Sequence, residues 1–397
     1  MNHALGERLV VARKRRRLNQ EDVAALLGVT RVLVSHWENG KRRPAEHVLE
    51  RLAQIYGVTL EELLAEVFEP SGSDLVELLY RDAEGGIDPQ AHAGLEDFVR
   101  FLGEFAHLAT DLDEDLAPLT QSPFKLRPGF TSKDDVRRKA LEVRDWLRIG
   151  LGPVGDLPGI LDGIGITVYR TGLGSDLSTG VSGAFLQHPV VGMSIAVNVE
   201  TTPGRQLFTL AHELAHALFH SDREHHLVSY WTRRDDKERF ADQWAGEFLV
   251  PVEGLRQTAE QLGVDRRLEA EDVIQLQRHF GVSYGMMLLR LRHVGLVNPA
   301  RHEELKRVSP VALAAQLGYS IAPDERGQDP SRWRLERFPR RFVRLLVRGL
   351  RERRLSPSTA AGLTGLTLDE IAELVTPPDG GDEEVIEELR EYERVTG

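Results

Sequence analysis

Hydrophobic positions recur at helical spacing along most of the chain. In residues 203–220 the leucines lie three or four positions apart, which predicts an amphipathic helix with one buried side. Residues 237–251 repeat the pattern with aromatic side chains, and Pro251 ends this second predicted helix. Residues 73–87 and 94–109 have the same periodicity. The sequence therefore predicts a mainly helical protein.

The flank of the first of these helices carries candidate chemistry. His212, Glu213 and His216 spell H-E-x-x-H. Side chains four residues apart share one helical face, so both imidazoles reach a single ion. Glu213 then points at the open coordination position, where it serves as a general base. This spacing is typical of a zinc peptidase.

A third ligand is expected downstream, because hydrolytic zinc commonly takes three protein ligands and keeps one position open. Glu238, on the second predicted helix, is our choice. Asp242 follows one turn later, where its carboxylate accepts the free ring N–H of a ligating His. Glu247 is the competing acid, but it lies two and a half turns beyond Glu238, so both do not easily face one ion.

Three further histidines follow the first helix. His220, His225 and His226 are interpreted as a solvated cluster at the helix end, where cations suit the dipole. The alternative is that one of them, or Tyr230, donates a hydrogen bond to the oxyanion.

These motifs resemble those of a known family. GRQLFTLAHELAHALFH, followed by KERFADQWAGEFLVP, is similar to the ImmA/IrrE metallopeptidases. The resemblance implies zinc bound by His212, His216 and Glu238, with Glu213 as general base and Asp242 at an Asn/Asp position of the family.

The resemblance also has implications for the fold. It covers about residues 133–297 and implies an α+β, zincin-like domain. Its small sheet would be built from residues 164–170, 183–187 and 194–198, and a short helical unit at 279–297 would close it. The sequence departs from the family pattern at Trp244 and Val250, and neither touches the chemistry.

A second motif lies near the N-terminus. Residues 18–44 have a helix-turn-helix layout, with Gly28 at the turn and Val34 and Trp37 on the apolar side of the second helix. Residues 5–66 resemble the XRE, or lambda-repressor-like, DNA-binding domain.

That resemblance implies which residues contact double-stranded operator DNA. Thr30 caps the recognition helix in that resemblance. Lys41 is expected separately, from its charge, to contact phosphate. Arg31 is able to bind guanine through two hydrogen bonds, whereas Val32 meets only a thymine methyl. The complete predicted set is Gln20, Thr30, Arg31, Val32, Ser35 and Lys41. Residues 1–43 hold ten Lys or Arg against four acids in a chain with a net charge of −12, so positive charge is concentrated where DNA would bind.

The remaining segments are less specific. Residues 67–122 carry 13 acids and two Arg, and residues 111–118 suggest a flexible link. This segment is interpreted as a dimerisation helix, a partner for the basic face, a strand that a protease cuts, or a plain spacer. Residues 326–354 contain 11 Arg interleaved with aromatic residues. We favour an amphipathic helix pair whose Arg stems cover apolar surface over a nucleic-acid contact.

These observations predict four segments. They are an all-α helix-turn-helix domain at 1–66, an acidic helical linker at 67–125, a zinc peptidase domain at 126–297 and a helical region at 298–397. The chain has no cysteine, no membrane-length apolar run and no signal-peptide pattern, so a cytoplasmic, nucleoid-associated homodimer is expected.

Two functions follow from the motifs. The first is a transcriptional regulator fused to a zinc endopeptidase that cuts a repressor-type protein, itself or a partner, to relieve repression. The alternative is an antitoxin or autorepressor of a toxin–antitoxin, stress-response or phage-response module. Its partner would be a cognate toxin, and its metal domain would act as a sensor.

Overall fold

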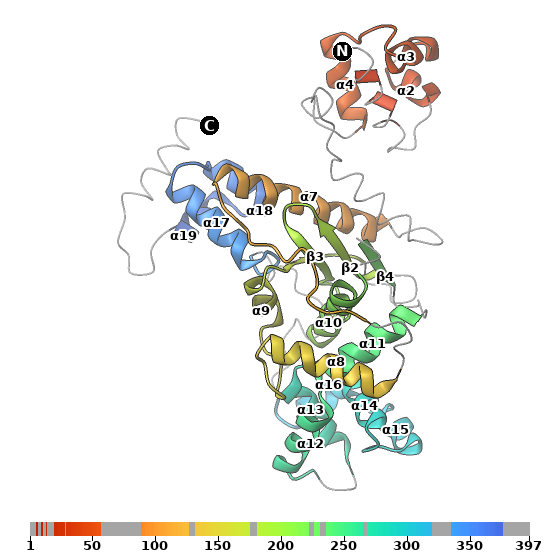
Figure 1. Cartoon of the computed structure of the whole chain (residues 1–397), viewed down its shortest axis with the longest axis vertical. Coiled ribbons are helices and arrows are strands. Elements are labelled where there is room, and N and C mark those ends of the chain that lie inside the picture. The colour runs from red at the N-terminus through yellow and green to blue at the C-terminus, as the bar shows by residue number, and fades with distance from the viewer. Residues whose placement is uncertain are drawn as a thin grey trace. The chain divides into compact units, whose positions relative to one another are not determined.

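The computed structural model of the chain divides into two compact units, residues 1–81 and 82–397 (Figure 1). It describes residues 5–6, 9–10, 13, 20–27, 29–56, 89–126, 132–174, 181–221, 226–230, 236–264, 268–319 and 335–375. The predicted fold class is confirmed, because helices dominate both units and one small sheet lies in the second. In the described part, no helix is both long enough and apolar enough to cross a membrane. The predicted helix at 73–87 lies outside the described residues.

The first unit is a small helical domain. Helices α2 (Gln20–Leu27), α3 (Arg31–Glu38) and α4 (Glu46–Tyr56) pack on one core that includes Val23, Val34 and Trp37. The side chain of Thr30 accepts a hydrogen bond from the Leu33 amide, so it caps α3 as predicted.

The second unit is built around a four-stranded mixed sheet of order β1-β3-β2-β4. Strands β2 (Val181–His188) and β3 (Gly192–Asn198) form a hairpin, and β1 (Thr167–Thr171) pairs parallel with β3. The three predicted strands are therefore present. Strand β4 (His226–Tyr230), which we did not predict, pairs antiparallel with β2.

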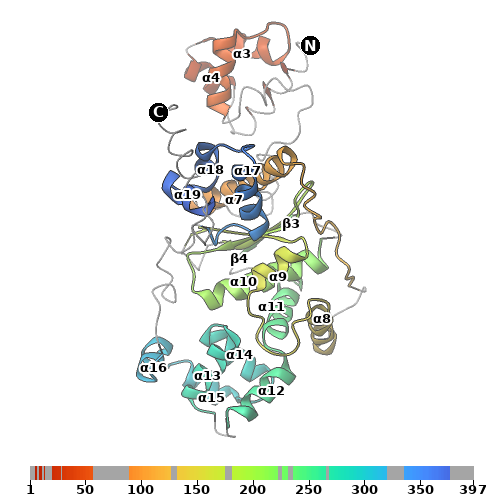
Figure 2. The same ribbon diagram turned by 90° about the vertical axis from the view of Figure 1, so that its left-hand side faces the viewer.

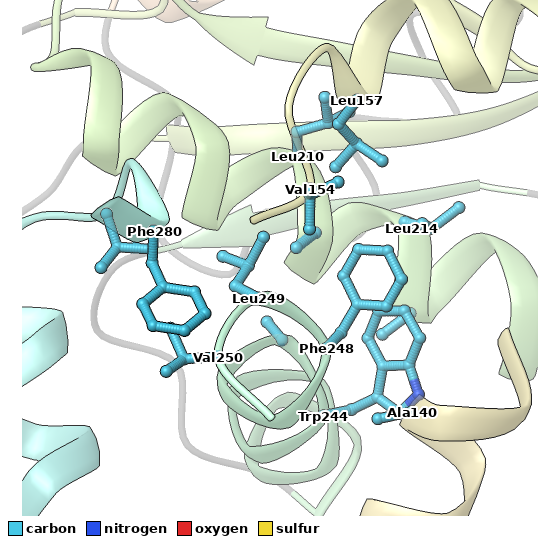
Figure 3. Close-up of a cluster of buried hydrophobic side chains, with 14 of the residues drawn as sticks. Ala140, Val154, Leu157, Leu210, Leu214, Trp244, Phe248, Leu249, Val250 and Phe280 are labelled. Atoms are coloured by element: carbon cyan, nitrogen blue, oxygen red, sulfur yellow. The ribbon is translucent and has the colours of Figure 1, made fainter. Parts of the chain in front are cut away.

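One face of the sheet is covered by helix α10 (Pro203–Phe219), which crosses β2 and β3. Helix α11 (Asp236–Leu249) packs on α10, and α8 (Lys133–Trp146) packs on α11. Figure 2 shows these helices on the opposite side of the sheet from α7. In the core between them, Trp244 stacks on Phe248 with ring centroids 4.7 Å apart (Figure 3). Trp244 also meets Phe219 of α10 edge to face at 5.6 Å, a contact that holds α10 and α11 side by side.

Beyond α11 the chain forms a group of shorter helices, which lie below α8 and α11 in Figure 1. Together with α9, which precedes β1, their bounds are α9 (Leu157–Gly163), α12 (Val252–Gln261), α13 (Ala270–Phe280), α14 (Tyr284–His293), α15 (Pro299–Leu305) and α16 (Pro310–Gln316). Ser283 caps α14, and Arg290 on α14 donates to the Val250 carbonyl at the end of α11. The helical unit expected at 279–297 is thus fastened to the second predicted helix.

The other face of the sheet is covered by helices from both ends of this unit. Helix α7 (Pro89–Asp111) packs on β1 and β2, and α17 (Arg340–Arg351) packs on α7. Phe101 of α7 stacks on Tyr169 of β1 at 4.3 Å and meets Phe342 of α17 edge to face at 5.1 Å. The short helices α18 (Pro357–Thr364) and α19 (Leu368–Val375) follow α17.

The prediction of a flexible link at residues 111–118 is wrong. Leu112 and Leu116 are buried, and the Leu116 carbonyl accepts a hydrogen bond from the Arg341 guanidinium at 2.7 Å. Arg348 donates to the Leu112 carbonyl at 2.6 Å. Arg348 also pairs with Glu114, so α17 contacts both the backbone and one acid of this segment.

The preference for an amphipathic basic segment over a nucleic-acid contact is supported in α17. Its apolar side, including Phe342 and Leu346, is buried. The Arg341 side chain pairs with the buried Asp162 at 2.7 Å, and its backbone amide donates to the same carboxylate at 3.0 Å. Arg341 therefore binds an acid of its own unit.

Candidate functional site

The candidate metal centre lies on α10, which begins with Pro203 at its first turn after Thr202. His212, Glu213 and His216 are all buried, and Glu213 and His216 have no exposed surface. Every residue from Thr209 to Phe219 is buried. This part of the helix therefore lies between the sheet and α11, with no side exposed to solvent. Helix α11 brings Glu238, also buried, to the same place.

The three side chains place their donor atoms together. His212 Nε2 lies 3.0 Å from Glu238 Oε2 and 3.1 Å from His216 Nε2, and His216 Nε2 lies 3.6 Å from Glu238 Oε1. All three ligand atoms lie within 4.8 Å of one another. The structure therefore brings together the two histidines of α10 and Glu238, as the sequence predicted, and that they bind a metal stays a prediction.

This donor set fits zinc. Bond lengths of about 2.0–2.1 Å place neighbouring donors of a tetrahedral zinc ion about 3.3 Å apart. The His212 Nε2–His216 Nε2 separation of 3.1 Å is close to this value, and each imidazole has a Glu238 oxygen at 3.0 or 3.6 Å. Two imidazoles and one carboxylate are also the ligands of a hydrolytic zinc site that keeps a fourth position open.

The second ring nitrogens of both histidines are held by neighbouring side chains. Asp242 Oδ1 lies 3.0 Å from His212 Nδ1, where we predicted it. His220 Nδ1 lies 2.8 Å from His216 Nδ1, which sequence reasoning missed. Ligation through Nε2 requires the proton on Nδ1, so each contact selects the tautomer that a metal needs.

The His220 contact overturns the solvated-cluster interpretation for that residue. His220 is only partly exposed and packs edge to face on Phe240 at 5.5 Å. Burial, with the neighbouring His216, lowers the pKa of His220 to about 3, so its ring is neutral and able to accept a hydrogen bond. His225 lies outside the described residues, and His226 and Tyr230 lie on β4 with side chains outside the described part.

The electrostatics of the centre favour a cation. Burial alone would lower the pKa of His212, but hydrogen bonds to Asp242 and Glu238 outweigh it and raise that pKa to about 10. Burial would likewise raise the pKa of Glu238, but hydrogen bonds from His212 and His216 hold it well below its usual range. The carboxylates that raise the pKa of His212, those of Asp242, Glu238 and Glu213, would favour a bound cation in the same way, and a metal would have to displace the proton.

Glu213 is positioned by the sheet. A Cβ atom on Gly183 of β2 would lie 2.9 Å from Glu213 Cγ and Oε1 and 2.8 Å from Thr209 Cγ2. Only glycine therefore allows β2 to approach the proposed base this closely. No pattern in the sequence indicated this contact.

The competing acid, Glu247, has another role. Its carboxylate accepts a hydrogen bond from Arg290 Nη1 at 2.6 Å and a second from Nη2, which joins α11 to α14. Glu247 is thus part of a bidentate ion pair, and it does not belong to the donor group around His212.

The metal centre opens into a cleft of about 710 Å³. Side chains from α8, α10, α11, α12 and α14 line it, and these include His212, Glu238 and Asp242. Phe208, Met286 and Leu289 supply apolar surface. A cleft of this size accommodates a stretch of extended peptide next to the metal ligands.

In the first unit, the residues predicted to contact DNA differ in their surroundings. Arg31 and Val32 are exposed at the start of α3, and Lys41 is exposed beyond its end. Arg31 pairs with Glu21 at 3.0 Å, and Ser35 Oγ accepts a hydrogen bond from Asn39. Gln20 instead donates to the buried Glu38 at 2.8 Å.

Arg13 completes the contact to Glu38, with its Nε 2.6 Å from Glu38 Oε1. The side chain of Gln20 therefore helps hold α2 against α3, a role that its position in the motif did not reveal. Its DNA contact stays a prediction, as do those of the other five residues.

Comparison with known proteins agrees with this geometry. Residues 161–292 match the peptidase M78 family, described as an IrrE N-terminal-like domain, and residues 11–63 match a helix-turn-helix family. The chain thus combines a helix-turn-helix DNA-binding domain with an M78 metallopeptidase-like domain that contains the buried His212, His216 and Glu238 group.

Two further comparisons add no functional argument. The search of curated proteins gave no match. Among solved structures, the crystal structure of ComR from Streptococcus suis covers 100% of this chain and 96% of its own at 10% identity. Its TM-score of 0.16 is too low to bear on fold or function.

Proposed function

We propose that the protein is a DNA-binding regulator with a zinc-dependent endopeptidase in its second unit. The observation that carries the proposal is the convergence of His212 Nε2, His216 Nε2 and Glu238 within 4.8 Å. Glu213 lies on the same helix, and a cleft of about 710 Å³ lies beside the group. The match to the M78 peptidases supports peptide hydrolysis as the chemistry.

Zinc, when bound, supplies a Lewis acid that polarises the scissile carbonyl. Glu213 takes a proton from the attacking water and delivers it to the leaving nitrogen as the C–N bond breaks, which yields one carboxylic acid and one amine. Asp242 and His220 keep the rings of His212 and His216 aligned. Gly183 allows the Glu213 carboxylate to remain against β2.

The proposed substrate is a repressor-type protein, and the first unit brings the enzyme to operator DNA. Self-cleavage within residues 111–118 has no support, because Arg341 and Arg348 hold the backbone of that segment. An extended peptide is what a protease cleft binds, so a second protein, or a different segment of a second copy, fits the cleft better.

The test measures zinc content and proteolysis in the same samples. We expect one zinc per wild-type chain, a loss of zinc in His216→Ala, and full zinc with no proteolysis in Glu213→Gln. Circular dichroism of each variant checks that it is folded. Equal zinc in wild type and His216→Ala would contradict the metal assignment.

The regulatory alternative predicts a different result. An antitoxin or autorepressor that uses the metal unit only as a sensor retains its repression, and the relief of that repression, in Glu213→Gln. A reporter driven by the promoter of the protein's own operon, compared between wild type and Glu213→Gln under stress, distinguishes the two. An unchanged reporter would favour the antitoxin.

A further inference from the structure

The charges of the cleft point to a chemical class of substrate. Its lining contains six Lys or Arg and four Asp or Glu, in a chain whose net charge is −12. Three of the six cations pair with acids of the same unit: Arg290 with Glu247, Arg137 with Glu253 and Arg239 with Asp236. Lys133, Arg205 and Arg256 supply the remaining positive charge of the lining.

Most of the negative charge in the cleft is already used within the protein. Glu238 and Asp242 bond to His212, and Glu247 forms its ion pair with Arg290. Only Asp134, exposed at the start of α8, adds an acid outside these contacts. A bound divalent ion would add further positive charge, so the cleft presents a positive potential to a substrate.

The cations are spread along the cleft rather than gathered at one point. Lys133 is exposed at the start of α8, and Arg256 is exposed on α12. Among the described residues, neither forms an ion pair within 4 Å. Arg205 is half-buried on α10, two turns before His212, and burial lowers its pKa. A carboxylate beside Arg205 would favour its charged form.

Apolar surface lies between these charges. Leu289 on α14 is 44% exposed, and Met286 lies one turn before it on the same helix. A large exposed leucine inside a charged cleft offers a contact for an apolar side chain of a bound peptide. The lining thus combines separated cations with an apolar contact next to the metal ligands.

We infer that the cleft selects an acidic, extended peptide segment that also carries apolar side chains, with Lys133, Arg205 and Arg256 binding its carboxylates. This inference rests on the proposed peptidase function and names its substrate class. Lys133 and Arg256 are exposed to solvent, so each contributes modestly to the affinity for the peptide. Together they produce a preference for acidic peptides, and salt weakens that preference.

The test measures peptide binding separately from cleavage. The zinc-loaded full-length Glu213→Gln protein is titrated against a fluorescein-labelled peptide, EELLAEVFE, which has the sequence of residues 61–69. The control peptide, QQLLAQVFQ, keeps the length and apolar residues and removes the side-chain charges. We expect the acidic peptide to bind at least about ten-fold more tightly at low salt, and this advantage to shrink as salt rises.

Matched variants locate the preference. In the Glu213→Gln background, Lys133→Ala and Arg256→Ala each weaken the acidic peptide by about two- to five-fold and leave the neutral peptide unchanged. Arg138→Ala is the control, because Arg138 is exposed on α8 but does not line the cleft. Equal binding of the two peptides, or an equal loss in Arg138→Ala, would overturn the inference.

Peptide hydrolysis and the preference for acidic peptides are contradicted by different results. If zinc-loaded wild-type protein cuts a mixed peptide library without enriching acidic sites, the peptidase stands and the acidic preference is wrong. If the acidic peptide binds selectively but no peptide is cut, the preference stands and the proposed hydrolysis is wrong.

Discussion

At the scale of single residues, the position of Gly183 against Glu213 is the most constrained contact of the site. Gly183→Ala places a methyl group 2.9 Å from Glu213 Oε1 and 2.8 Å from Thr209 Cγ2. Both atoms belong to buried side chains of α10, so the helix or the carboxylate must shift. We expect zinc to be retained, proteolysis to fall by about ten-fold or more, and stability to fall by about 1–3 kcal/mol.

The matched control is Gly103→Ala on α7, where a Cβ meets nothing within 4 Å. There the replacement of a helical glycine stabilises the protein by up to about 1 kcal/mol and leaves proteolysis unchanged. Zinc analysis, a peptide-cleavage rate and urea unfolding measure all three effects. A fully active Gly183→Ala protein would show that the base does not need this close approach.

A second residue makes stability depend on pH. His188, the last residue of β2 and 9% exposed, accepts hydrogen bonds at Nδ1 from the Val190 and Val191 amides of the β2–β3 turn. Burial lowers its pKa to about 4, with a smaller contribution from His107. The unfolded state therefore binds the proton first, and His188 contributes stability above about pH 6.5 that is lost as pH falls through about 4.

Between pH 7 and pH 5, His188 changes the free energy of unfolding by at most about 2 kcal/mol, since pH 5 lies about 1.5 pH units below the unfolded pKa. Urea unfolding at both pH values measures this change. His188→Asn keeps an acceptor for the turn amides but removes the titration. We expect the variant to lose less stability than wild type between the two pH values. Parallel losses would assign the pH dependence to other groups.

Single residues of the site were predictable where their relative positions depend only on spacing along one helix. The positions of His212, Glu213 and His216 follow from spacing on one helix, and Asp242 follows from Glu238 in the same way. His220 had an equivalent signal, since it lies four residues after His216, but we gave more weight to the helix end. Gly183 had no signal, because its contact joins a strand to a helix distant in sequence.

At the scale of elements, the helices at 94–109, 203–220 and 237–251 were predictable because each carries its own hydrophobic period, whereas the three strands were implied by the resemblance to the ImmA/IrrE metallopeptidases. Strand β4 is only five residues long and pairs at the edge of the sheet, so its pattern is short. Residues 111–118 are acidic and lack a period. Their order comes from Arg341 and Arg348, more than 200 residues later, and local sequence does not show such contacts.

Arg341 also joins α17 to α9 through an ion pair with Asp162, and this pair gives a further prediction. Asp162 is buried and receives both the guanidinium and the backbone amide of Arg341. Arg341→Ala leaves that carboxylate without its guanidinium partner, and we expect a loss of about 3–5 kcal/mol in the free energy of unfolding. Urea denaturation measures the change.

The neighbouring Arg340 provides a matched comparison. It pairs with Asp156 at 2.6 Å, but its side chain is 74% exposed. Arg340→Ala is expected to cost at most about 1 kcal/mol, because solvent screens an exposed pair. Similar losses in the free energy of unfolding for the two variants would mean that burial of Asp162 does not determine the strength of its ion pair with Arg341.

At the scale of the whole molecule, the two units divide the proposed chemistry. The first unit holds the exposed Arg31, Val32 and Lys41, and the second holds the buried metal group. Ten of the Lys and Arg residues lie within residues 1–43, although the chain is acidic overall. That distribution was evident in the sequence, since charge counts need no tertiary information.

DNA recognition by the full-length chain tests this division. Arg31 is about 60% exposed and near the N-terminus of α3, from which a recognition helix presents side chains to base edges. Arg31→Ala is expected to relax preference at one operator position by about 1–3 kcal/mol. Lys41→Ala should weaken all sequences alike and lower the slope of binding against salt by about one.

The control is Glu213→Gln, which alters the second unit alone and should bind operator and random DNA as wild type does. Band-shift or anisotropy titrations at several salt concentrations, against the promoter of the protein's own operon and random DNA, give both quantities. Arg31 also pairs with Glu21. Some loss of affinity for random DNA in Arg31→Ala is therefore compatible with a base contact by Arg31. A loss for Arg31→Ala that is equal on operator and random DNA would show that Arg31 contacts phosphate only, which would leave base reading to other residues of α3.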